Sequence, residues 1–95
     1  MVYEVRFQTV DPARREEYVK IYKETVQGCK SAGSAGGFIM CSEDDPGGVV
    51  VVLRWESKEQ LARWRGTPSY NSFRAAVEGL QAKKSRGGLY TADTI

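Results

Sequence analysis

A run of β-branched residues that ends in tryptophan, Val49 to Trp55, is the clearest pattern in the chain. Such a run predicts a β-strand. Its alternating positions form two apolar faces: Val49, Val51, Leu53 and Trp55 on one, and Val50 and Val52 on the other. Arg54 is its only polar residue. A strand with two apolar faces needs cover on both sides of its sheet, and a chain this short has helices for one side only.

The N-terminal segment, Val2 to Thr9, alternates between apolar and polar residues. This period of two predicts a half-buried strand. Its apolar face consists of Tyr3, Val5 and Phe7, and its polar face consists of Glu4, Arg6 and Gln8. We expect Arg6, together with Arg54, to face the side of the sheet that a second molecule covers and to form pairs across that interface.

A long amphipathic helix follows. Asp11 and Pro12 form a typical helix start, with an N-cap carboxylate and proline in the first turn. Apolar and small residues then recur at intervals of three and four: Tyr18, Ile21, Tyr22, Thr25, Val26 and Cys29. This spacing predicts one buried stripe on a helix that ends by Gly33.

The second half of the chain predicts a hairpin, two helices and a last strand. A strand over Phe38–Glu43 joins the central strand through a turn rich in Asp, Pro and Gly. Ser57 and Gln60 form a capping box that starts a short helix, and Thr67-Pro68 starts the next. The final strand is predicted over Gly87–Ile95.

The predicted order is βαββαβ, the ferredoxin-like plan of the α+β class: an antiparallel sheet with helices on one face. Residues 1–95 form one domain of this kind. The apolar second face of the sheet predicts a homodimer in which two sheets pack together, a dimeric α+β barrel.

Composition narrows the chemistry. The 95 residues carry a net charge of +2, with Lys and Arg spread along the chain, which argues against a nucleic-acid partner. We expect no membrane partner and a cytoplasmic location, because no long apolar run or secretory leader is visible.

The two cysteines, Cys29 and Cys41, are expected to be free thiols. There is no histidine, which removes the commonest general base and metal ligand, and no metal site is predicted.

The segment after the central strand resembles a known family. It reads W-E-S-K-E-Q-L-A-R-W from Trp55 to Trp64, followed by T-P-S-Y from Thr67 to Tyr70. With the βαββαβ order, this is similar to the antibiotic biosynthesis monooxygenase superfamily of dimeric α+β barrels, whose members often read W-x-S/D-x-E-x-L-x-x-W/H. Tyr70 stands where many members have histidine, which argues against haem-degrading activity.

The resemblance is closest to small anthrone-oxidising monooxygenases of aromatic polyketide pathways, and it implies a site. The tryptophan and tyrosine of that site correspond to Trp64 and Tyr70. The amide corresponds to Gln60, where the related enzymes carry asparagine. The arginine corresponds by position to Arg86, with Lys84 as the alternative.

The implied activity is cofactor-independent monooxygenation of a phenolic or anthrone-type polyketide, or of a quinol, with dioxygen as co-substrate and no metal or flavin. An isomerase or cyclase on the same scaffold, or a non-catalytic small-molecule-binding barrel, remains an alternative. A small or filled pocket, with Trp64 and Tyr70 packed solid and Arg86 pointing into water, would favour the last of these.

Overall fold

The structure is a computed structural model that describes residues 1–31 and 33–95. Four strands, three α-helices and one short 3-10 helix (η1) follow one another along the described chain. In order they are β1 (Val2–Thr9), η1 (Pro12–Arg14), α1 (Arg15–Ser31), β2 (Gly36–Cys41), β3 (Gly48–Trp55), α2 (Lys58–Arg65), α3 (Pro68–Glu78) and β4 (Arg86–Tyr90).

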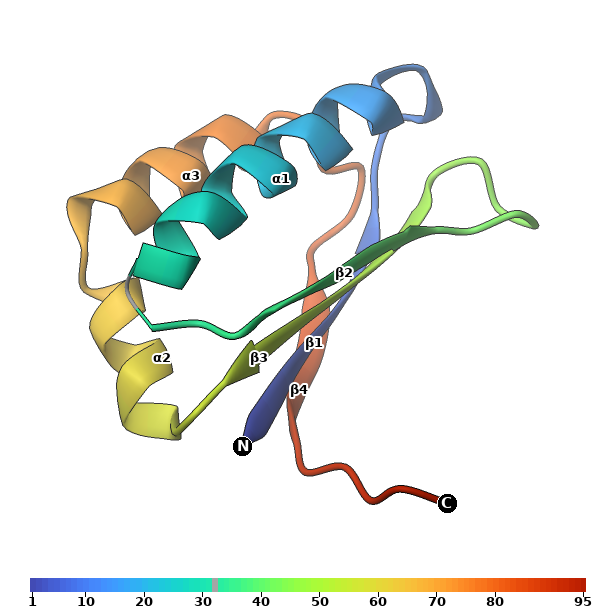
Figure 1. The fold of residues 1–95 in the computed structure, drawn as a ribbon. Coiled ribbons are helices and arrows are strands. Elements are labelled where there is room, and N and C mark those ends of the chain that lie inside the picture. The colour runs from blue at the N-terminus through green and yellow to red at the C-terminus, as the bar shows by residue number, and fades with distance from the viewer. Residues whose placement is uncertain (32) are drawn as a thin grey trace.

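The strands form one antiparallel sheet in the order β2-β3-β1-β4. Helices α1 and α3 lie side by side over one face, and α2 lies at the end of the sheet where β3 stops (Figure 1). This confirms the predicted α+β ferredoxin-like fold. The last strand is shorter than predicted: it ends at Tyr90, and the residues after it form no regular structure.

The helices begin where the sequence predicts. The Asp11 side chain accepts a hydrogen bond from the Ala13 amide at the start of η1, which leads directly into α1. Ser57 and Thr67 cap α2 and α3 in the same way. Each cap satisfies a backbone N–H that has no partner within the helix, so the two short helices have defined starting points.

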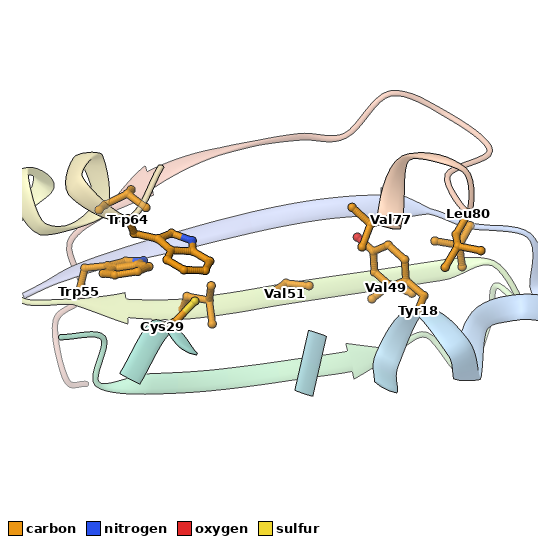
Figure 2. Packing of buried hydrophobic residues seen from close by; sticks show 11 residues of the cluster. Tyr18, Cys29, Val49, Val51, Trp55, Trp64, Val77 and Leu80 are labelled. Atoms are coloured by element: carbon orange, nitrogen blue, oxygen red, sulfur yellow. The ribbon is translucent and has the colours of Figure 1, made fainter. Parts of the chain in front are cut away.

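The hydrophobic core lies between the helices and the sheet. The predicted inner face of β3 is buried, and Trp55 is fully so. Figure 2 shows the core in two groups along the sheet: Trp55, Trp64 and Cys29 at one end, and Tyr18, Val49, Val77 and Leu80 at the other. The α1 stripe predicted from its spacing packs into this core, with Tyr18 and Cys29 buried.

Strand β1 faces the other way from what its polarity suggests. Glu4 pairs with Leu53 and Gln8 with Val49, so the polar side chains lie on the same side of the sheet as the core. Glu4 and Gln8 are only 8% and 4% exposed. The expectation that Arg6 faces a subunit interface is therefore wrong, because Arg6 lies opposite Val51, beneath the helices.

The apolar residues of β1 lie on the face of the sheet that no helix covers. Phe7 is there, and the register places Phe38 and Met40 of β2 on the same side through Val52 and Val50. Phe38 is 62% exposed and Met40 is 49% exposed. Arg54 also lies on this face, as expected, and its guanidinium donates to the Ala35 carbonyl at 3.0 Å. We call this side of the sheet the open face.

Candidate functional site

A cavity of about 650 Å³ lies between the helices and the sheet. Every helix from α1 to α3 contributes to its wall, as do β1, β3 and the segment that joins α3 to β4. Its lining includes Cys29 and Trp64 from one end of the core and Val77 from the other, so it occupies the middle of the domain (Figure 2). This volume is typical of pockets that hold small organic ligands.

Aromatic side chains form one wall of the cavity. Tyr22 meets the Phe73 ring edge to face, with 4.8 Å between centroids, and Trp64 meets the Tyr70 ring in the same way at 5.9 Å. Tyr70 and Phe73 connect the two pairs, with their ring centroids 6.4 Å apart. All four line the cavity. A wall of rings at these separations suits a flat aromatic ligand, which gains from stacking and edge contacts.

Glu4 is the centre of a charged network on the sheet side of the cavity. Its Oε2 accepts from Arg65 Nη2 at 2.9 Å and from Arg6 Nε at 3.3 Å. Its Oε1 accepts from the indole N–H of Trp55 at 3.4 Å. The Glu4 side chain is 11% exposed, so the two guanidinium groups supply the charge compensation that a buried carboxylate requires.

The remaining charges around the cavity are mainly positive. Five cationic residues line it, against two carboxylates: Arg6, Arg65, Arg74, Lys83 and Lys84 against Glu4 and Glu78. This excess is larger than the net charge of the whole chain, +2, so the positive charge is concentrated here. Such a lining favours an anionic ligand or an anion that forms during a reaction.

Two ionisable groups in the wall stay neutral near neutral pH. Burial raises the pKa of the Tyr22 phenol, and the nearby Tyr18 and Glu4 raise it further. Burial likewise raises the pKa of the Cys29 thiol to about 12. In both cases the low-polarity surroundings disfavour the charged form. Neither group is therefore a ready source of negative charge in the cavity.

The cavity brings together two of the residues that the family resemblance implies, Trp64 and Tyr70. Trp64 is 6% exposed, and its indole N–H forms no hydrogen bond with the part of the chain that the structure describes. The Tyr70 hydroxyl accepts from Arg74 Nη1 at 3.2 Å, and that guanidinium lies 5.9 Å from the ring centroid. Both side chains are thus packed and also line the cavity.

Gln60 and Arg86 lie outside the cavity wall. The Gln60 Oε1 accepts from the Glu56 amide at 3.0 Å, so this side chain completes the capping of α2. Arg86 pairs with Phe7 in the sheet, and its guanidinium lies 5.0 Å from the Phe7 ring centroid, on the open face. Lys84, the alternative to Arg86, does line the cavity.

Sequence reasoning missed Glu4, Arg6 and Arg65 as members of the site. The alternating pattern of β1 was a signal for Glu4 and Arg6. It places both on the polar face of the strand, and such a face can line a cavity instead of meeting solvent. Arg65 adjoins Trp64 at the end of α2, where a cation is ordinarily explained by the helix dipole.

Within residues 1–31 and 33–95, no group of three or more His, Cys, Asp or Glu side chains is arranged to hold a metal ion. None of the helices described has the length and apolar character needed to cross a bilayer.

The family model described as antibiotic biosynthesis monooxygenase matches residues 1–76. Comparison with curated protein sequences finds no significant match.

Solved structures share the fold. One is SnoaB, a cofactor-independent oxygenase from Streptomyces nogalater, at 22% identity and a TM-score of 0.84, with 99% of this chain and 94% of that chain covered. Another comes from Nitrosomonas europaea and is provisionally described as an antibiotic biosynthesis monooxygenase, at 18% identity and a TM-score of 0.86, with 96% and 88% covered. Identities this low establish a common fold and not a common activity.

Proposed function

Because this chain belongs to the antibiotic biosynthesis monooxygenase family, we propose that it is a cofactor-independent monooxygenase. The proposed substrate is a phenolic or anthrone-type aromatic polyketide, or a quinol, which dioxygen converts to a quinone. The fold shared with SnoaB, described as a cofactor-independent oxygenase, supports the absence of metal and flavin from the reaction.

One observation carries the proposal: the cavity combines an aromatic wall with a cationic lining. A cofactor-free oxygenase needs both properties. Its substrate must first lose a proton and become an electron-rich anion, which then passes electrons to dioxygen. The rings hold the flat substrate, and the positive charges stabilise the anion.

The reaction balances without another reductant. In an anthrone, the reacting methylene carbon loses one proton to give the anion. The anion reacts with dioxygen to give a carbon-bound peroxide, which takes back one proton and becomes a hydroperoxide. Loss of water from the hydroperoxide breaks the O–O bond and removes the second hydrogen of that carbon. One oxygen atom remains as the quinone carbonyl and the other leaves as water.

The proposed roles of Trp64 and Tyr70 follow from their placement. Trp64 can stack on the substrate and donate its indole N–H to a substrate oxygen. The Tyr70 hydroxyl can donate its proton to a substrate oxygen while it accepts from Arg74. A well-aimed hydrogen bond to developing negative charge is worth about 3 kcal/mol of barrier lowering. Stabilisation by a longer-range positive charge is assigned to Lys84, on the segment before β4.

We also propose that the protein acts as a homodimer in which two open faces pack together. The supporting observation is the set of exposed apolar side chains on that face, led by Phe38 and Met40. Exposed apolar surface of this extent on a sheet marks an interface, because leaving it in water is unfavourable.

The test is oxidation of dithranol, an anthrone, by purified protein treated with a metal chelator. We expect conversion to the quinone above the spontaneous rate, with stoichiometric oxygen uptake at an oxygen electrode. Tyr70→Phe should lower kcat by roughly two orders of magnitude, since it removes one hydrogen bond to developing charge. Tyr90→Phe makes the same chemical change outside the cavity lining and is the matched control.

The results separate the candidate functions. No rate above background would overturn the oxygenase proposal. Conversion of a polyketide substrate without oxygen uptake would instead identify the isomerase or cyclase that the same charged, ring-lined cavity also suits.

The two candidate cations can be compared directly. Lys84→Gln and Arg86→Gln each remove one positive charge near the same strand. If Lys84 stabilises the anion, only the first variant should lose turnover. The opposite result would show that Arg86, from the open face, acts in the reaction.

A further inference from the structure

The Glu4 network contains more hydrogen-bonding capacity than the protein uses. Arg6 donates only through Nε and Arg65 only through Nη2 to Glu4. No other hydrogen bond from either guanidinium is made to the part of the chain that the structure describes. Each group has five N–H donors in a rigid plane, so most of the donors of this pair are available.

Both guanidinium groups are also held in place. Each is bound to the same oxygen of Glu4, which brings the two cations together at one position on the sheet side of the cavity. Their side chains are 32% and 36% exposed, intermediate between a buried ion pair and a solvated charge. One carboxylate cannot neutralise two guanidinium groups, so the cluster keeps a net positive charge.

We propose that Arg6 and Arg65, positioned by Glu4, form a carboxylate-binding site in the cavity, so that its ligand is a planar aromatic acid. A carboxylate matches the forked geometry of guanidinium donors, and a second anion here restores charge balance to the cluster. The aromatic wall accepts the ring system, and the cluster fixes the orientation of the ring by its acid group. The inference rests on the proposed function, because it takes this cavity as the substrate site.

Binding of two matched probes tests the site. Anthraquinone-2-carboxylate and anthraquinone-2-carboxamide have the same ring and nearly the same shape, and they differ in charge. Titration calorimetry on the full chain should show that the carboxylate binds tighter by about tenfold, as expected for added charged hydrogen bonds. Arg6→Gln and Arg65→Gln should each remove most of this preference while the carboxamide affinity changes little.

Arg63→Gln is the matched control. It removes the same charge from the same helix as Arg65, and Arg63 is exposed and does not line the cavity. This variant should keep the preference for the carboxylate. Circular dichroism of all three variants checks that each is folded.

Several outcomes would overturn the inference. Equal affinity for the two probes would do so, and so would a preference that persists in both Arg6→Gln and Arg65→Gln, which would place the anion at the lysines instead. Failure of both probes to bind would also reject the site. Dithranol oxidation measured on the same preparation reports separately on the proposed function, because dithranol carries no carboxylate.

Discussion

Glu4 illustrates how a charged side chain becomes stable beneath the helices of a small domain. Its carboxylate accepts from two guanidinium groups and from the Trp55 indole. Removing a charge from water is costly unless it is paired and hydrogen-bonded, and here every donor comes from a different part of the chain: β1 itself, β3 and α2. The network thereby joins the sheet to the last residue of α2.

The two cysteines should differ sharply in reactivity. Cys29 is buried and its thiol pKa is raised to about 12, whereas Cys41 is exposed. Since the thiolate is the reactive form, iodoacetamide at about pH 8 should modify Cys41 quickly and Cys29 only after denaturation. Peptide mass spectrometry checks this. Modification of Cys29 as fast as Cys41 in the native protein would contradict the described packing.

The same raised pKa gives stability a pH dependence of known sign. The folded protein keeps the Cys29 proton at pH values where the unfolded chain, with the ordinary pKa of 9.0, releases it. This contribution to the free energy of unfolding is therefore complete below about pH 9 and is lost as the pH rises toward about 12. Acidification should not reduce it.

At the level of single residues, the sequence indicated the aromatic part of the site better than the charged part. Trp64 and Tyr70 were predicted and both line the cavity. Glu4 and Arg6 were not: Glu4 was placed on the polar face of an alternating strand, and Arg6 was assigned to a subunit interface. Only the register with Leu53 and Val51 shows that they lie beneath the helices.

Among the elements, α2 is the one whose stability depends most on the hydrogen bonds at its N-terminus. It has eight residues, too few for a stable helix in isolation, and Leu61 and Trp64 anchor it to the core. Ser57 Oγ accepts from the Gln60 amide at 3.2 Å, and the Gln60 side chain accepts from the Glu56 amide. Capping thus fixes where α2 begins and, through it, where Trp64 and Arg65 reach the cavity.

Removing the cap should measurably destabilise the domain. Ser57→Ala deletes the hydrogen bond to the Gln60 amide and should lower the free energy of unfolding by about 1 kcal/mol in urea denaturation. Ser72→Ala makes the same change at an exposed position within α3, where alanine is a good helix former, and should have no destabilising effect. Equal losses in both variants would show that the cap contributes nothing specific.

The type and order of the elements could be predicted from periodicity, turn residues and caps. Where a strand ends, and which of its faces the helices cover, could not. Strand β4 ends at Tyr90, which pairs with Tyr3 of β1, and the residues after it, which were predicted to continue the strand to Ile95, form no regular structure. For β1, alternation defined two faces correctly. It could not say which of them the helices cover, since that depends on pairing with β3.

For the molecule as a whole, the open face is the feature that bears on the oligomeric state. The expectation of a dimer came from the two apolar faces of β3, and the structure places the apolar residues of β1 and β2 on that same side. Whether two such faces pack together depends on contacts between molecules and not on contacts within one chain. The homodimer therefore stays a prediction.

A single charge on the open face should separate the subunits. Phe38→Glu puts a carboxylate where the side chain is 62% exposed in one chain and would be buried between two. Analytical ultracentrifugation should give the mass of a dimer for the unmodified protein and of a monomer for this variant. Ala76→Glu, exposed on α3, is the control and should remain dimeric. A monomeric unmodified protein at micromolar concentration would contradict the proposal.

The position of the two tryptophans gives the domain an optical reporter of its own. Trp55 and Trp64 are the only indoles in the chain, and both lie at the same end of the core (Figure 2), where Trp64 lines the cavity. Their emission originates beside any bound guest, and quinones are efficient acceptors of excited-state energy or electrons. Arrival of a substrate, its conversion and release of a coloured product should each change the fluorescence of the unlabelled protein, so a stopped-flow trace could resolve the steps in a single turnover.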